Sequence, residues 1–285
     1  MMDLESRIGR EDFVALCDCL GLAERDIGAR PLSGGIYSRT VLVTSPTGEW
    51  VVRLPMDGLL GGLGSERETA LLSAMADAGL SPSPLDDAPL GYVVTRYLAG
   101  ARPLTEEDTR DSGTLQRITK RLRELHSVPF ELPEFKAAVA ARSYVDSLGE
   151  VDLTGEQRAW CAECLELAGT YEQQHGGALT LCHNDLVASN ILDDGELWFI
   201  DFEYAVRADP LLDLAGLAAM NRFSTDRCGL LVDSYFGDED PPFGPQTFAK
   251  TIRLLRLISY LWALANSERN APADAFVARM AAMLR

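Results

Sequence analysis

A short strand-like segment, residues 179–202, interrupts a region whose pattern is otherwise helical, and it restricts the possible folds of this chain more than any other feature. Two apolar runs, Ile191-Leu192 and Trp198-Phe199-Ile200, lie on either side of the turn sequence Asp193-Asp194-Gly195. Apolar runs joined by such turn residues predict a β-hairpin. A third apolar run, Leu181-Cys182, precedes a polar loop. The segment is therefore predicted to be a small β-structure around a polar loop.

The polar residues of this segment are predicted to meet at one end of the hairpin. Asp185 and Asn190 lie before its first strand, and Asp201 follows its second strand. Because a hairpin returns the chain to the end at which it began, two carboxylates and an amide oxygen should converge. Oxygen ligands of this kind suit Mg²⁺, which fills its remaining positions with water and phosphate oxygens. The sequence therefore predicts a metal and phosphate site.

Turn formation offers a second explanation of the same residues. Asp185, Asn190 and Asp193-Asp194 are of types common in turns, and each of them alone is explained in that way. The set is explained better by phosphoryl transfer, because His183, Asp185 and Asn190 match the catalytic loop H-x-D-x-x-x-x-N of kinase-type phosphotransferases. Asp201, which ends the next apolar strand, matches their metal-binding aspartate.

The first hundred residues are predicted to form a small lobe rich in β-structure. The expected elements are a helix, a hairpin, a second helix and a strand, at residues 11–20, 40–54, 65–78 and 92–95. Ser65 and Glu68 have the spacing of a capping box, so Ser65 is expected to cap the second helix. Residues 96–100 are expected to cross into the rest of the chain.

The remainder of the chain is predicted to be mostly helical. Six stretches carry apolar residues at helical spacing: residues 115–126, 135–148, 154–175, 210–220, 225–236 and 247–266. The whole pattern predicts an α+β fold of two lobes. An antiparallel β-rich lobe with one main helix is expected over residues 1–97, and a larger helical lobe over residues 98–285.

Several motifs spread over the chain resemble those of one known family. They are Leu32-Ser33-Gly34-Gly35, Val52-Arg53-Leu54-Pro55, Leu125-His126-Ser127, His183-Asn184-Asp185 with Asn190, Ile200-Asp201-Phe202-Glu203-Tyr204-Ala205, Asp209-Pro210 and Asp213-Leu214-Ala215. Over residues 31–236 the chain is similar to the aminoglycoside phosphotransferase and choline kinase superfamily, and most of all to its choline kinase-like branch. The resemblance implies a protein kinase-like fold and a small-molecule kinase that depends on ATP and Mg²⁺.

The resemblance implies roles for the residues of the β-rich segment. Asp185 would orient the acceptor hydroxyl and take its proton, while Asn190 and Asp201 would hold Mg²⁺ on the ATP phosphates. Glu203 would be a ligand of a second metal ion or of the substrate. Two further residues would support the loop structurally: His183 and Asp213.

The resemblance also implies a nucleotide site in the small lobe. The loop Ser33-Gly34-Gly35 would cover the phosphates, since glycines let backbone N–H groups approach closely. Arg53, in place of the lysine of protein kinases, would bind phosphate oxygens through its planar fork. Its ion-pair partner would be Glu68 or Glu66, although Glu68 could instead be a capping or surface glutamate. The adenine would be held by backbone groups at Thr95 and Tyr97.

The acceptor is expected to be a small cationic alcohol, with choline or ethanolamine favoured. A quaternary ammonium needs aromatic faces and a carboxylate, and Trp262 lies in a segment that resembles the W-x-x-W helix of choline kinases. Further candidates near the motifs are Tyr204, Tyr235, Glu203 and Asn221. Two features depart from the choline kinase pattern: the second tryptophan position is Ala265, and the acidic residue that family members often carry near Met220-Asn221 is absent. The alternative for Trp262 is a core aromatic residue on an apolar helix.

Other acceptors and another function class remain open at this point. Thiamine, an aminoglycoside or a sugar would use the same chemistry, and a kinase-like protein that binds nucleotide for regulation would turn over little. The intact Asp185, Asn190 and Asp201 favour an enzyme over such a regulator. The sequence leaves the oligomeric state open.

The charge of the chain limits its partners. With 43 acidic and 26 basic residues the formal net charge is −17, so nucleic acid and anionic membrane surfaces would be repelled. The N-terminus has no leader pattern, and no apolar stretch reaches the roughly 20 residues of a membrane span, so a cytoplasmic protein is expected. Of the six cysteines only Cys161 and Cys164 have a ligand-like spacing, and these are expected to be reduced packing thiols.

Overall fold

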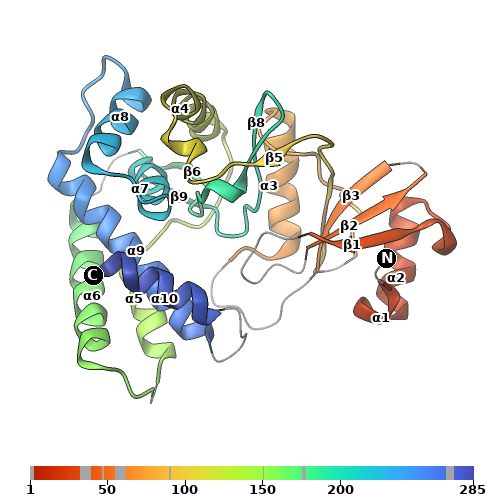
Figure 1. The fold of residues 1–285 in the computed structure, drawn as a ribbon, viewed down its shortest axis with the longest axis horizontal. Helices are drawn as coiled ribbons and strands as arrows, with labels where there is room; N and C mark the ends of the chain where they lie inside the picture. The colour runs from red at the N-terminus through yellow and green to blue at the C-terminus, as the bar shows by residue number, and fades with distance from the viewer. Residues whose placement is uncertain are drawn as a thin grey trace. The chain divides into compact units, whose positions relative to one another are not determined.

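The computed structural model in Figure 1 describes residues 3–32, 40–46, 48–54, 62–89, 91–149, 151–174, 178–267 and 273–285. The chain forms two compact units. The first contains Met1–Arg102 and Leu192–Glu203, and the second contains Pro103–Ile191 and Tyr204–Arg285. The predicted phosphate loop, Ser33-Gly34-Gly35, lies outside the described residues.

An antiparallel sheet of four strands forms the centre of the first unit. Its strands are β1 (Gly28–Pro31), β2 (Thr40–Ser45), β3 (Gly48–Arg53) and β4 (Val93–Arg96), in the order β1-β2-β3-β4. β2 and β3 form the predicted hairpin, with Val41 opposite Val52 and Val43 opposite Trp50. Branched and aromatic side chains fit the pleated surface of a strand, which explains why these runs form β-structure.

Helices and apolar contacts complete the first unit. Its helices are α1 (Glu5–Ile8), α2 (Arg10–Leu20), the short 3₁₀ turn η1 (Glu24–Asp26) and α3 (Ser65–Asp77). Phe13 and Leu16 of α2 belong to one buried cluster with Val41, Val43 and Val52 of the sheet. The strand residues in this cluster are two apart, so they share one face of the sheet.

The start of α3 differs from the predicted capping box. Ser65 is the first residue of the helix rather than its cap, and its hydroxyl accepts from Gly91 N–H at 3.2 Å. The Glu68 side chain is buried, with 1% of its surface exposed, and it pairs with Arg53. The predicted capping box was wrong. Glu68 pairs with Arg53 of β3 instead of bonding to the start of α3, and local spacing does not reveal such a tertiary ion pair.

The predicted hairpin of the β-rich segment is confirmed. It consists of β7 (Ile191–Asp193) and β8 (Leu197–Phe199), which form a sheet with β5 (Arg102–Pro103) in the order β5-β7-β8. Asp193 Oδ1 closes the turn by accepting from Gly195 N–H at 3.0 Å, and Gly195 has the positive φ of +110° that glycine adopts readily. The apolar run before the loop forms β6 (Thr180–Cys182), which pairs with β9 (Val206–Ala208).

The second unit is mostly helical, as predicted. Its helices are α4 (Ser112–Ser127), α5 (Ala137–Ser147), α6 (Gly155–Gln174), α7 (Leu211–Met220), α8 (Thr225–Phe236), α9 (Pro245–Ser267) and α10 (Ala273–Leu284), with 3₁₀ turns η2 (Asp108–Arg110) and η3 (Ala188–Asn190). The first six agree with the predicted stretches to within a few residues, whereas α10 was not predicted. Figure 1 shows α9 running beside α5, α6 and α10, and α9 also packs against α7.

The helix α7 lies in the interior of the second unit. Nine of its ten residues are buried, and one of these is the charged residue Asp213. A helix that is apolar on all sides must be covered on all sides, which explains its central position. Asp213 therefore has to find polar partners within the protein.

In the part of the chain that the structure describes, no helix is both long enough and apolar enough to span a membrane.

Candidate active site

The predicted catalytic loop connects β6 to η3 in the second unit. Asp185 is half-buried, and its Oδ2 accepts from Asn190 Nδ2 at 2.9 Å. The same Nδ2 donates to the backbone carbonyl of Asp185 at 3.0 Å. Asn190 is buried and is the last residue of η3. Its backbone N–H donates to Val187 O at 3.0 Å. The two loop residues predicted to carry the chemistry thus lie side by side, joined through the amide nitrogen of Asn190.

Backbone conformation marks two motif residues. Asn184 has φ of +62° and Asp201 has φ of +67°. Non-glycine residues adopt this left-handed region rarely, and asparagine and aspartate tolerate it best. Among the residues that the structure describes, only Arg222 is a further non-glycine residue with positive φ. Such conformations cluster at functional sites, where the surrounding contacts hold them in place.

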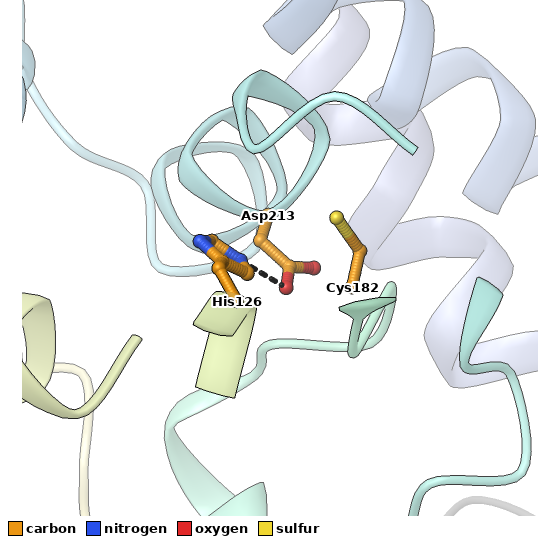
Figure 2. Close-up of side chains that lie close together, drawn as sticks. All are labelled: His126, Cys182 and Asp213. Carbon is orange, nitrogen blue, oxygen red and sulfur yellow. Dashed lines mark hydrogen bonds and ion pairs between the residues drawn. The ribbon is translucent and has the colours of Figure 1, made fainter. Parts of the chain in front are cut away.

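Asp213 anchors the beginning of the loop to α7. Its Oδ2 accepts from His183 N–H and its Oδ1 from Asn184 N–H, both at 2.7 Å. His126 of α4 adds a third contact, with Nε2 at 3.1 Å from Oδ2 (Figure 2), and Nδ1 of the same ring lies 2.6 Å from the Tyr235 hydroxyl. These donors offset the cost of burying a carboxylate completely.

The buried group in Figure 2, His126, Cys182 and Asp213, has the residue types of a metal site. Its side-chain donor atoms lie within 4.8 Å of one another. The oxygens of Asp213 already accept three hydrogen bonds, and burial raises the pKa of the Cys182 thiol well above its usual value. A thiol must lose its proton to bind a metal, so this cluster is explained by hydrogen bonding instead.

His183 and Asn221 also contact the loop. His183 is fully buried, and its Nδ1 accepts from Asp185 N–H at 3.3 Å. Asn221, which follows α7, is also buried, and its amide bonds to the backbone at Leu186 and Ala188. Asn221 was predicted to contact the substrate, and the structure places its side chain against the loop backbone.

The first unit holds the predicted phosphate-binding arginine. Arg53, at the end of β3, forms ion pairs with Glu68 of α3, with Asp201 at 2.5 Å and with Glu203 at 3.3 Å. Glu66 is exposed on α3, so of the two predicted partners the structure selects Glu68. The guanidinium fork presents several N–H groups in one plane, which lets a single arginine reach three carboxylates.

Three carboxylates around one cation shift the pKa values of this cluster. Burial raises the pKa of Glu68 to about 7, since the charges of Asp201 and Glu203 add to the effect and Arg53 offsets it only in part. Burial and the charge of Asp201 likewise raise the pKa of Glu203 to about 7. Burial lowers the pKa of Arg53, but the three carboxylates outweigh it and raise that pKa on balance. When all three carboxyl groups are ionised, the cluster carries more negative charge than Arg53 can neutralise.

The donor set of this cluster fits a divalent cation. Asp201 and Glu203 offer carboxylate oxygens, which are the ligands that Mg²⁺ prefers. The excess negative charge is also what a bound cation would neutralise. On the second unit, Asn190 offers an amide oxygen and Asp185 a carboxylate. The residue types present in each unit are therefore those of a magnesium and phosphate site.

The predicted adenine-binding residues lie at the end of β4. Thr95 pairs with Val51 of β3, and Tyr97 N–H donates to Glu49 O at 3.1 Å. Both Thr95 and Tyr97 are half-buried.

Three aromatic rings form a chain in the second unit. The rings of Tyr204 and Trp262 have centroids 6.1 Å apart, and those of Trp262 and Phe276 are also 6.1 Å apart, both in edge-to-face geometry. Tyr204 is tied to the catalytic loop, because its carbonyl accepts from Asn184 Nδ2 at 3.1 Å. Phe276 lies in α10, which the sequence pattern did not predict, so this ring was not among the predicted site residues. Tyr235, another predicted candidate, belongs to the His126 network instead.

The fold and this loop geometry define a class of protein. A choline/ethanolamine kinase family protein from Mesorhizobium loti shares 26% sequence identity and a TM-score of 0.76, with 96% of this chain and 94% of that chain covered. The choline kinase LicA from Streptococcus pneumoniae shares 20% identity and a TM-score of 0.79, with 99% and 97% covered. Aminoglycoside phosphotransferases share the fold as well. The chain thus has the predicted α+β, protein kinase-like fold that these solved structures share.

The family follows from the sequence match. Residues 28–249 match the phosphotransferase enzyme family, so the chain belongs to that family. Protein LicA from Haemophilus influenzae is 27% identical over 206 residues, which are 71% of this chain and 61% of that protein. The chain thus covers less than two thirds of the length of that relative.

Proposed function

We propose that the protein transfers the γ-phosphoryl group of ATP to the hydroxyl of a small cationic alcohol, with choline or ethanolamine favoured. The observation that carries this proposal is the pair formed by Asp185 and Asn190 on a loop that Asp213 holds to α7. The choline kinase and choline/ethanolamine kinase names of the similar proteins support the choice of acceptor. A cytoplasmic location is part of the same proposal.

Asp185 is the proposed catalytic residue. Its carboxylate orients the acceptor hydroxyl and takes its proton, while the acceptor oxygen bonds to the γ-phosphorus and the bond to the bridging oxygen of ADP breaks. Asn190 and Asp201 are the proposed Mg²⁺ ligands, with Glu203 as a further metal or substrate ligand. Mg²⁺ would neutralise charge on the phosphate oxygens. In this reaction, correct positioning and charge neutralisation supply most of the rate enhancement.

The proposed nucleotide site belongs to residues 1–97. Ser33, Gly34 and Gly35 would cover the phosphates, Arg53 would bind phosphate oxygens with Glu68 holding its fork, and the adenine would be held at Thr95 and Tyr97. The proposed acceptor site belongs to residues 98–285. A solved LicA structure contains AMP, which supports nucleotide binding by this fold.

The aromatic chain supports a cationic acceptor. Ring faces attract an ammonium group, and Tyr204 lies next to the loop that carries Asp185. Trp262 is half-buried and contacts both of the other rings, so it is available to a ligand in a way that a fully buried core residue is not. Phe276 supplies an aromatic face although Ala265 stands at the second tryptophan position.

The experiment that tests this proposal measures ADP release from ATP and Mg²⁺ with choline, ethanolamine, thiamine, a hexose and two aminoglycosides. We expect stimulation by choline or ethanolamine, and loss of activity on chelation with EDTA. Asp185→Asn should lower kcat by about 100-fold or more while ATP binding, followed by calorimetry, persists. For the best acceptor, Trp262→Leu should raise its KM about tenfold and leave the KM for ATP unchanged.

Three outcomes would count against the proposal. Stimulation only by an aminoglycoside would show that the acceptor is an aminoglycoside rather than a small cationic alcohol. Full turnover by Asp185→Asn would remove the catalytic assignment. Nucleotide binding without turnover on any acceptor would favour a regulatory protein.

A further inference from the structure

Asn221 makes an unusually complete set of hydrogen bonds to backbone. Only 1% of its surface is exposed. Its Oδ1 accepts from Ala188 N–H at 2.9 Å, and its Nδ2 donates to Leu186 O at 3.1 Å and to Leu217 O at 2.8 Å. Two of these bonds reach the catalytic loop, and the third reaches the helix that Asn221 follows. The amide therefore connects the loop directly to the end of α7.

The backbone of the loop requires both a donor and an acceptor at this position. Leu186 presents a carbonyl and Ala188 presents an N–H group. A side-chain amide offers both functions on one planar group, whereas a carboxylate offers acceptors only. An aspartate at this position would place a carboxylate oxygen against two carbonyl oxygens. Asparagine therefore complements the hydrogen-bonding groups of the loop backbone, whereas aspartate, which has nearly the same shape, does not.

Asp185 lies between two anchors on the same helix. Asp213, near the start of α7, holds the N–H groups of His183 and Asn184. Asn221 holds the loop on the other side of Asp185, at Leu186 and Ala188. The two anchors are eight residues apart, about 12 Å along a helix. Because α7 is buried on nearly every side, it provides a rigid support for both.

Other helices fix the end of α7 that carries Asn221. Arg256 of α9 donates from Nε to Ala219 O at 3.4 Å, and Arg279 of α10 donates from Nη2 to Met220 O at 3.3 Å. The last carbonyls of a helix have no partner within the helix, and cations there also interact favourably with its dipole. The position of Asn221 thus depends on α9 and α10 as well as on α7.

We propose that Asn221 is a positioning residue that holds Asp185 in place through the backbone of residues 186–188, and that it does not bind the acceptor. This inference rests on the proposed function for its kinetic consequences. Both N–H groups and the oxygen of the Asn221 amide are bonded to backbone, which leaves its buried side chain no donor for a substrate. A displacement of about 1 Å at a catalytic group costs on the order of 100-fold in rate.

The test compares Asn221→Asp and Asn221→Ala with the full-length parent protein. We expect kcat to fall about 100-fold, with the KM values for ATP and for the acceptor within about threefold of the parent. Hydrogen exchange of the peptide that covers residues 183–192 should accelerate in both variants. Exchange in β2 and β3 should be unchanged.

Thr251→Val is the matched control. Thr251 is buried on α9, and its hydroxyl donates to Thr247 O at 3.0 Å, the carbonyl four residues earlier. Asn221 makes the same kind of bond to Leu217, so both substitutions remove one buried bond within a helix turn. Only Asn221 also contacts the loop. The control should keep the parent kcat and the parent exchange of residues 183–192.

Several results would overturn the inference. A large rise in the acceptor KM with kcat preserved would make Asn221 a substrate contact. Accelerated exchange throughout the second unit would make it a general packing residue. If the parent phosphorylates no acceptor, the proposed function fails, but the exchange of residues 183–192 still decides whether Asn221 holds the loop. If Asn221→Ala does not fold, Asn221→Asp, which preserves the side-chain volume, decides alone.

Discussion

Arg53 is the cation of a cluster of charged side chains in the first unit. Glu68, Asp201 and Glu203 all pair with it, and the Arg53 side chain is only 19% exposed. A buried cation without partners would be costly, and three carboxylates without a cation would repel one another. Each member therefore depends on the others. The same excess of negative charge that suits a metal ion should make the metal-free protein sensitive to pH.

We predict that Glu68 lowers the stability of the metal-free protein as pH rises. Its pKa is about 7 in the folded state against an ordinary value of 4.5, so between these values the folded state binds more protons than the unfolded state. The free energy of unfolding should therefore fall as pH rises from about 4.5 to 7 and level off above it. One group can contribute a slope of up to about 1.4 kcal/mol per pH unit.

Urea unfolding at several pH values in EDTA measures this slope. Glu68→Gln should reduce it, because the uncharged amide does not titrate, and the slope that remains should come from Glu203, whose pKa is also raised to about 7. Glu66→Gln is the matched control, since Glu66 is exposed on the same helix, and it should keep the parent slope. Equal slopes for the two variants would contradict the assignment to Glu68.

At the scale of elements, α4, α7 and α8 meet at a single buried network. His126 lies in the last turn of α4, Asp213 lies in α7 and Tyr235 lies in α8. The His126 ring forms hydrogen bonds with both of the other side chains. The rings of His126 and Tyr235 also meet edge to face, with centroids 5.6 Å apart. Because Asp213 holds the catalytic loop, the packing of these helices and the geometry of the loop are linked.

We predict that His126→Ala lowers the free energy of unfolding by about 2–4 kcal/mol, since it removes a buried ring and leaves Asp213 and Tyr235 each without one partner. Tyr235→Phe should cost about 1 kcal/mol, the usual value of one hydrogen bond. Ser127→Ala is the control, because the neighbouring Ser127 is exposed and its hydroxyl donates to Glu124 O at 2.6 Å within the same helix. It should change stability by less than about 0.5 kcal/mol. A similar loss in His126→Ala and Ser127→Ala would contradict this role.

At the scale of the whole molecule, the six cysteines are all free and are distributed through both units. Cys19 and Cys228 are half-buried, and the other four, Cys17, Cys161, Cys164 and Cys182, are buried. Cys161 and Cys164 lie in α6, where burial raises the pKa of both thiols, that of Cys164 to about 12. Thiols of this kind act as apolar packing groups.

We predict that alkylation of the native protein at neutral pH follows burial. Iodoacetamide reacts with the thiolate, so Cys19 and Cys228 should be labelled before the four buried cysteines, with Cys164 and Cys182 among the slowest. Mass spectrometry of the labelled peptides gives the order, and denatured protein provides the control in which all six react. Early labelling of Cys164 or Cys182 in the native protein would contradict their burial.

Features that depend on neighbours along the chain can be predicted from the sequence alone. The valine-rich runs of β2 and β3, the Asp-Asp-Gly turn between β7 and β8, and the helical spacing of α4 to α9 act over a few residues, so their patterns are visible without a structure. The spacing of Asp185 and Asn190 is equally local. It predicted the loop that we propose to be catalytic, and it indicated the phosphotransferase family that the family match confirms.

Which distant groups meet depends on how the folded chain packs. Glu68 rather than Glu66 pairs with Arg53, Asn221 bonds to the loop backbone, and Phe276 joins Trp262. The members of these contacts are separated by 14 to 35 residues in sequence, and nothing in the local pattern of either member specifies its partner. Burial makes the choice, because a polar group removed from water must take whichever partner the packing places within reach.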